Sequence, residues 1–181
     1  INTIDGGSIT AKYGIYNRNL RTQGVSSGVY TAIKEGAVAT IGTIRDVTVT
    51  ATKQYALWNG GKIDTICGTS KFFNTGTDNN VVYNSNAWYY DTDVAYRSDE
   101  TNNGFVRTET RKEEDDFIPT IGTIKDDVEI SSSTCSYGLL NNGNIGSIEG
   151  NVKISAKSYA LAVTGGGKIG SINGNGETGI T

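Results

Sequence analysis

Pairs of isoleucines separated by two residues recur along the chain. The six pairs are Ile1/Ile4, Ile41/Ile44, Ile63/Ile66, Ile121/Ile124, Ile145/Ile148 and Ile169/Ile172. Where the intervals between pairs are regular, they measure 22, 24 and 24 residues. Similarity of a chain to itself at a fixed period predicts a repeat architecture, in which each unit buries its apolar face against its neighbours.

Two shorter apolar pairs follow the isoleucines in the regular units. They are Val47/Val49, Val128/Ile130 and Val152/Ile154, and then Tyr55/Leu57, Tyr137/Leu139 and Tyr159/Leu161. Because alternate side chains of a strand point to the same face, each pair predicts a short strand with one inward face. Connectors rich in Gly and Asn, such as residues 59–62, suit the sharp corners between units.

The pattern predicts an all-β parallel β-solenoid with triangular coils of 22–24 residues, folded as a single domain. An antiparallel sandwich also has alternating strands at short intervals. A sandwich does not require the same residue types to return at the same places of a longer unit, so the solenoid is favoured.

The first 40 residues fit the repeat only loosely. Ile1, Ile4, Ile9, Tyr13 and Ile15 occur in the expected order, but the next isoleucine pair begins at Ile41. This stretch holds either two compressed coils or one coil with a long loop, and the pattern leaves both open.

A second irregular stretch of 58 residues separates Ile63 from Ile121 and is rich in aromatic residues. We expect an insertion over residues 67–120, between coils formed by residues 1–66 and 121–181. Within the insertion, residues 93–100 and 105–111 predict a β-hairpin around the Asn-Gly pair of residues 101–104.

Composition narrows the function. The net charge is −3 with scattered Lys and Arg, which argues against nucleic acid as the main partner, and no apolar run is long enough for a membrane span. The chain has no histidine, which excludes His-dependent nucleophilic catalysis and most zinc sites.

Cys67 and Cys135 permit one possible disulfide. Their places within the repeat differ, and the sequence leaves the bond undecided.

Three segments of the chain resemble repeats of a known class of proteins. The segments are IGTIRDVTVTATKQYALWNGGKI, IGTIKDDVEISSSTCSYGLLNNGNI and IGSIEGNVKISAKSYALAVTGGGKI. They resemble the glycine-rich β-helical repeats in large surface and adhesin-like proteins of bacteria, especially gut anaerobes. The resemblance implies a right-handed parallel β-helix that serves as a stalk, an adhesive surface or an assembly module at the bacterial surface or outside the cell. It supplies no catalytic motif.

An aromatic cluster in the insertion is the candidate ligand site. Flat rings beside carboxylates suit stacking on sugar faces and hydrogen bonding to sugar hydroxyls, so a surface glycan is the expected ligand class. The residues are Trp88, Tyr89, Tyr90, Asp91 and Asp93. The alternative is that these rings only pack the insertion against the coils.

The acidic residues indicate neither a metal site nor a catalytic pair. No known calcium-binding loop matches the acidic residues Asp78, Asp91, Asp93 and 113–116, so we expect no metal and no cofactor. Parallel β-helices can carry polysaccharide lyases and hydrolases, but the regular coils offer few carboxylates. These are Asp46, Asp64, Asp126, Asp127 and Glu149. We therefore expect a non-enzymatic protein with no catalytic residues.

Both ends of the chain fall inside the repeat. Ile1 and Ile4 open a coil at once, and Ile169 and Ile172 begin another close to the last residue. Open strand edges invite pairing with another chain, so we expect these residues to form assembly edges of a homo-oligomer or filament. The alternative is that the edges belong to a longer solenoid.

Overall fold

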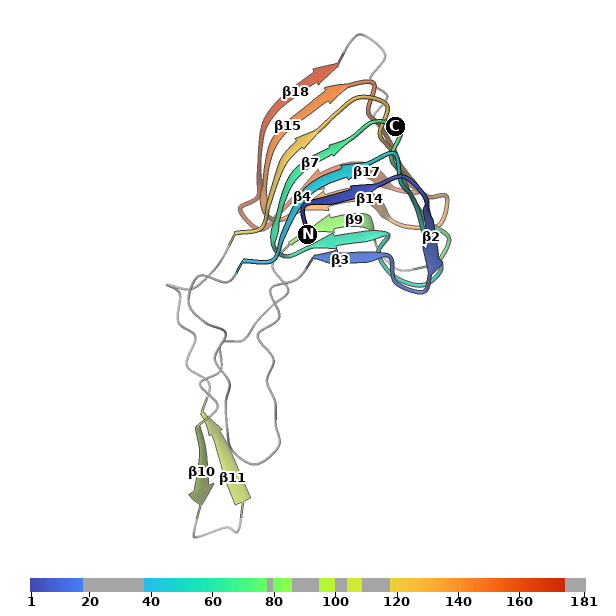
Figure 1. Ribbon diagram of the computed structural model, residues 1–181. Coiled ribbons are helices and arrows are strands. Elements are labelled where there is room, and N and C mark those ends of the chain that lie inside the picture. Colours follow the sequence, from blue (N-terminus) through green and yellow to red (C-terminus); the bar gives the residue numbers. More distant parts are fainter. Residues whose placement is uncertain (18–37, 78–79, 86–94, 100–103, 109–117, 175–181) are drawn as a thin grey trace.

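The computed structural model describes residues 1–17, 38–77, 80–85, 95–99, 104–108 and 118–174 (Figure 1). Within these ranges the regular elements are all β-strands. Most of the strands build three parallel sheets, and two form a separate antiparallel pair. The all-β prediction is confirmed.

The chain visits the three sheets in a fixed order, one strand in each sheet per coil. The first sheet holds β1 (Thr3–Asp5), β4 (Thr40–Arg45), β7 (Lys62–Cys67), β12 (Thr120–Ile124), β15 (Asn144–Gly150) and β18 (Lys168–Gly174). The second holds β2 (Ser8–Ala11), β5 (Thr48–Ala51), β8 (Lys71–Asn74), β13 (Glu129–Ser131) and β16 (Lys153–Ser155). The third holds β3 (Ile15–Asn17), β6 (Leu57–Asn59), β9 (Asn80–Asn84), β14 (Tyr137–Asn141) and β17 (Tyr159–Val163). Each strand pairs with strands one coil away, which defines a parallel β-solenoid.

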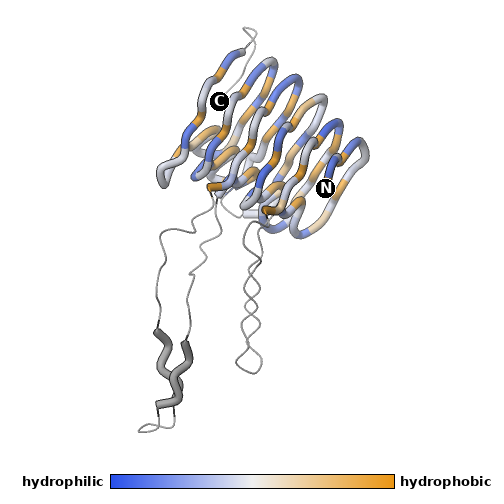
Figure 2. The backbone as a smooth tube through the Cα atoms, turned by 60° about the vertical axis from the view of Figure 1, so that its left-hand side comes forward, coloured by the Kyte–Doolittle hydropathy of each residue, from blue (hydrophilic) through white to orange (hydrophobic). Residues whose placement is uncertain are grey.

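The register places like residues on top of one another. Ile124 pairs with Ile66 on one side and with Ile148 on the other, and all three are fully buried. The preceding isoleucines form a parallel row, in which Ile121 lies between Ile63 and Ile145. In Figure 2 the hydrophobic positions recur from coil to coil along the stack. Each buried Ile side chain contributes about 1.5–3 kcal/mol relative to an exposed one, so the two rows are a main source of stability.

The first 40 residues contain one described coil. β1 pairs directly with β4, with Ile4 opposite Ile44, so no strand of another coil lies between them in the first sheet. β2 and β3 pair with β5 and β6 in the same way. Of the two possibilities that the sequence left open, the described residues therefore agree with a single coil, and residues 18–37 lie outside the described part of the chain.

The insertion begins later than residue 67. β8 and β9 pair with their counterparts in the coils before and after, and they complete the coil that Ile63 opens. Phe72 takes the place that Val49 and Ile130 hold in the neighbouring coils, and it is fully buried. The aromatic composition of this segment concealed the repeat, because a Phe fills the same core position as a Val or Ile. The additional residues therefore lie between Ser85 and Pro119.

The predicted hairpin is present. β10 (Ala95–Asp99) and β11 (Gly104–Thr108) pair in the antiparallel sense, with Ala95 opposite Thr108 and Asp99 opposite Gly104. Gly104 belongs to the strand, so the connection is residues 100–103 and is longer than a two-residue Asn-Gly turn. The hairpin forms a sheet of its own and pairs with none of the three coil sheets (Figure 1).

A core truncation tests the isoleucine rows. We expect Ile124→Ala to lower the free energy of unfolding by about 2–5 kcal/mol, because it opens a cavity in the middle of a fully buried row. Ile172→Ala is the matched control, since Ile172 continues the same row but is 47% exposed. Equal losses in a urea titration of the two variants would contradict the assigned register.

Candidate functional site

The predicted ligand cluster lies outside the described residues. Trp88, Tyr89, Tyr90, Asp91 and Asp93 all fall between Ser85 and the start of β10 at Ala95. The glycan site therefore stays a prediction from the sequence.

The predicted assembly edges are described and lie at the two ends of the first sheet. β1 and β18 are its edge strands. Ile1 is 74% exposed and Ile172 is 47% exposed, whereas Ile4 and Ile169 are half-buried against the core. Apolar side chains that are buried inside the stack are thus left in solvent at its ends, although the assembly itself stays a prediction.

A ladder of four buried asparagines runs along the corner between the third and first sheets. It consists of Asn17, Asn59, Asn84 and Asn141, which end β3, β6, β9 and β14. Each of the first three side chains donates from Nδ2 to Oδ1 of the next member, over 2.8, 2.8 and 2.7 Å. The asparagine ladder therefore connects four consecutive coils through side chains alone.

The same amides also hold the backbone of the corner. Asn59 Nδ2 donates to the carbonyl oxygen of Thr120 at 2.9 Å, and Asn141 Nδ2 donates to that of Lys168 at 3.0 Å. Asn59 Oδ1 accepts from the backbone N–H of Gly61 at 3.2 Å. Buried polar groups are tolerated only when they are hydrogen-bonded. The ladder meets this requirement because its amides bond to one another and to the backbone of the corner.

The sequence carries a signal for the asparagine ladder that hydrophobic patterning overlooked. An apolar residue, a large residue and then Asn occur at residues 15–17, 57–59, 82–84 and 139–141. Because Asn commonly occupies turns, each of these asparagines can be explained as a turn residue without reference to the other three. Only the shared place in the coil shows that the four side chains stack. In the next coil this place is taken by Val163, which pairs with Asn141 and is 45% exposed.

The corner between the first and second sheets depends on the left-handed backbone conformation. In five successive coils the residue after the outward-facing position has positive φ: Gly6 (69°), Asp46 (52°), Gly68 (65°), Asp126 (65°) and Gly150 (77°). Gly adopts this conformation without steric penalty, and Asp tolerates it better than most residues do. The two aspartates therefore occupy a place that the fold otherwise gives to glycine.

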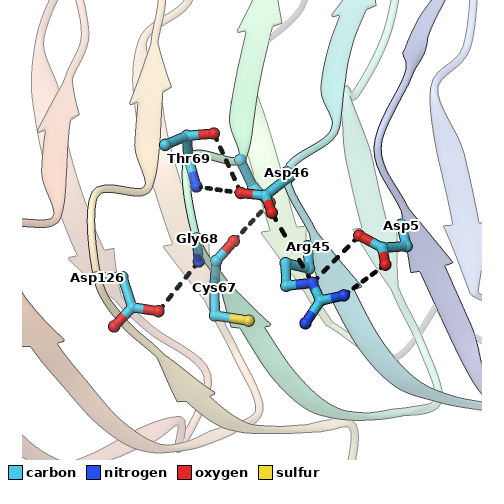
Figure 3. A network of polar contacts seen from close by, with 8 residues as sticks. Asp5, Arg45, Asp46, Cys67, Gly68, Thr69 and Asp126 are labelled. Carbon is cyan, nitrogen blue, oxygen red and sulfur yellow. Dashed lines mark hydrogen bonds and ion pairs between the residues drawn. The ribbon is translucent and has the colours of Figure 1, made fainter.

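The two corner aspartates bind the backbone of the coil between them (Figure 3). Asp46 Oδ1 accepts hydrogen bonds from the backbone N–H of Thr69 at 2.8 Å and from its hydroxyl at 3.1 Å. From the other side, Asp126 Oδ2 accepts from the backbone N–H of Gly68 at 3.1 Å. These carboxylates have a structural explanation, because each satisfies backbone donors of a neighbouring corner.

Two more of the predicted carboxylates, Asp64 and Asp127, also have local partners. Asp64 lies 2.9 Å from Lys62 Nζ, and Asp127 accepts from Asn151 Nδ2 at 3.1 Å. At the first coil, Arg45 donates from Nε to Asp5 at 3.1 Å. That hydrogen bond and the charge of Arg45 lower the pKa of the Asp5 carboxyl from its usual value. The pair is exposed to solvent, and exposed ion pairs contribute little to stability.

The two cysteines are free thiols at different corners. Cys67 ends β7 beside Arg45, whereas Cys135 lies between β13 and β14 and is fully buried. Burial is the main cause that raises the pKa of the Cys67 thiol, and the Asp126 carboxylate adds to it. The thiolate is therefore disfavoured, and the possible bridge between the two cysteines is not formed in the structure.

Aromatic side chains gather on the outer side of the third sheet, near its first three coils. Ring centroids are 5.4 Å apart for Tyr16 and Trp58, and 5.2 Å apart for the stacked rings of Tyr55 and Tyr83. The polar atoms of this cluster bind within the protein. Tyr16 donates its hydroxyl to Gln54, and Trp58 Nε1 donates to the carbonyl oxygen of Ser85. The cluster thus packs the face of the coils, as aromatic rows on a sheet commonly do.

In the part of the chain that the structure describes, no three metal-ligating side chains come together and no helix could span a membrane. Comparison with known proteins gives no further guide, since no family model, curated protein or solved structure matches the chain. The protein is therefore classified by its fold alone, as a parallel β-solenoid.

An aspartate in the asparagine ladder tests its hydrogen bonds. Asn84→Asp should lower the free energy of unfolding by roughly 1–3 kcal/mol, because a carboxylate cannot donate to Asn141 Oδ1 and is buried without a counter-charge. The buried carboxyl should have a raised pKa in the folded state. Stability should therefore recover as the pH falls, which denaturation at several pH values measures.

Asn173→Asp is the matched control for the ladder. Asn173 is exposed near the end of β18, so its replacement should change the unfolding midpoint little and without this pH dependence. A loss for Asn84→Asp no larger than the control's would show that the buried amides do not hold the coils together.

Proposed function

We propose that the protein is a structural module of the bacterial cell surface or the extracellular space, in which a stiff stack of β-coils displays the additional segments that are inserted at one corner. The observation that carries the proposal is the continuity of the side-chain rows. Isoleucine rows and the asparagine ladder pass through successive coils without interruption, including the coil from which the longest additional segment departs.

The positions of the additional segments support display. After Asn17 the described chain resumes at Val38, and after Ser85 the coils resume at Ile118. Both departures occur at the corner between the third and first sheets, in the first and third coils. At the same corner the second coil turns through residues 59–62 alone. The rows therefore do not need the additional residues.

The surface location rests on the resemblance of the repeats to glycine-rich β-helical repeats of bacterial surface proteins. A non-enzymatic role agrees with the chemistry of Asp46, Asp64, Asp126 and Asp127, whose carboxylates bind corner backbone, lysine or amide groups. Removal of a segment tests the scaffold role itself.

Removing the longer segment should leave the scaffold intact. Deletion of residues 86–118 together with Pro119→Gly joins Asn84 and Ser85 through one glycine to Thr120, which reproduces the short corner of the second coil. Ser85 is kept because its carbonyl oxygen accepts from Trp58 Nε1. We expect the far-ultraviolet circular dichroism of a β-protein and a thermal midpoint equal to the parent's or a few degrees higher, since a shorter loop loses less entropy on folding.

A longer deletion is the matched control. A variant that also lacks residues 71–85 loses β8 and β9 and with them Phe72 from the core, so its midpoint should fall sharply. Loss of folding in the shorter deletion would contradict display, because it would make the segment part of the scaffold.

A glycan-binding adhesin is the second candidate, and it rests on the aromatic sequence of the insertion. If it is correct, Trp88→Ala combined with Tyr90→Ala should abolish binding on a glycan array, because the stacking rings are removed. Tyr159→Ala, at a ring that is 58% exposed on the coils, controls for nonspecific loss. Unchanged binding by the double variant, or no binding by the parent, would exclude this candidate.

A further inference from the structure

We infer that the outer face of the second sheet, together with the corner that follows it, binds an acidic polysaccharide. The inference goes beyond display, because it assigns a ligand to the coils themselves and uses none of the aromatic residues of the insertion. The observation behind it is that lysines scattered along the sequence gather on one side of the coils, beside hydroxyl groups and one aromatic ring.

The described charges of the coils are divided between two sides. Five lysines and one glutamate, which leave a net charge of +4, lie on the second sheet or at the corner after it. They are Lys12, Lys53, Lys71, Lys153, Lys157 and Glu129. The first sheet and the corner after it hold six acidic and four basic side chains among the described residues. A positive face on a chain with a net charge of −3 attracts polyanions to that face.

The strand pairing brings these lysines together. Lys71 and Lys153 share one outward row of the second sheet with Glu129 between them, so their strands are roughly 10 Å apart. Lys12 and Lys53 lie on successive coils of the corner, where the carbonyl oxygen of Lys12 accepts the backbone N–H of Lys53 at 3.2 Å. All five lysines of the face are exposed. Glu129 lies 3.9 Å from Lys71 Nζ and offsets only one of the five positive charges.

The second outward row of this sheet supplies a ring and hydroxyl groups. Phe73 is half-buried and lies between Thr50 and Ser131 in the register, and Ser155 continues the row. Because alternate residues of a strand face the same way, this row and the lysine row open onto one surface. A ring stacks on a sugar face, hydroxyls bond to sugar hydroxyls, and ammonium groups bind carboxylate or sulfate. The surface therefore suits a polysaccharide that carries such acidic groups.

The same surface is less suited to nucleic acid. Proteins that hold single strands stack successive bases on several aromatic rings, whereas this face has one ring flanked by hydroxyl residues. Reading a duplex requires a helix or a β-ribbon that enters a groove, and the flat outer face of a sheet offers neither.

Two matched pairs of substitutions test the inference. Lys71→Gln with Lys153→Gln removes two charges from the proposed surface, whereas Lys62→Gln with Lys168→Gln removes two exposed lysines from the first sheet. Isothermal titration calorimetry should show that the parent binds polygalacturonate and does not bind neutral dextran. The first pair should weaken binding by roughly tenfold, and the second pair should leave it unchanged.

Phe73→Thr tests the ring, since it gives this position the residue type of its neighbour Thr50. It should weaken the binding of polygalacturonate, and an unchanged circular dichroism spectrum verifies that the coils remain folded. The variant that lacks residues 86–118 should bind as the parent does. That result separates this surface from the glycan candidate in the insertion.

Three outcomes would overturn the inference. An absence of binding by the parent, or equal losses in the two pairs of lysine variants, would exclude this surface. An oligonucleotide of thymidine that binds as tightly as polygalacturonate would show that the face attracts polyanions without selecting a polysaccharide. None of these results would affect the display role, which the deletion tests through folding alone.

Discussion

The structure depends on the parallel, in-register pairing of each strand with strands one coil away. A single coil cannot bury its apolar face by itself, so the isoleucines of the interior strands β4, β7, β12 and β15 are covered by the coils above and below. This pairing also decides which substitutions the chain accepts. A residue must suit its own turn and also the residues that precede and follow it in its row, as Phe72 does between Val49 and Ile130.

The corners satisfy the backbone in two different ways. Between the first and second sheets a left-handed residue turns the chain, and where that residue is Asp its carboxylate binds the N–H groups of an adjacent corner. Between the third and first sheets the asparagine ladder supplies donors and acceptors. Because the ladder holds Asn84 whatever residues follow it, long segments can leave the coil at this corner while the next strand still enters in register.

The sequence predicted the isoleucine rows, the coil length and the hairpin, because each depends on apolar periodicity or on local turn chemistry. It misplaced the start of the insertion, since Phe72 and Val82 appeared to belong to an aromatic segment when they fill rows held elsewhere by branched aliphatic side chains. It missed the asparagine ladder, because the reason for each Asn lies one coil away and not in its own neighbourhood. The predicted ligand residues, beginning with Trp88, lie in a stretch without the repeat, where periodicity supplies no information.

The asparagine ladder also gives the solenoid an electrical polarity. Every Nδ2 group in it donates toward the coil of higher number, from Asn17 to Asn59, on to Asn84 and then to Asn141. Four aligned amide dipoles therefore add, with the oxygen end at the first coil and the amino end at the fourth, much as peptide dipoles add along a helix. A coil inserted into this stack would continue the aligned hydrogen bonds only if it carried Asn at the same corner. The asparagine ladder therefore has a direction, which runs from the first coil to the fourth.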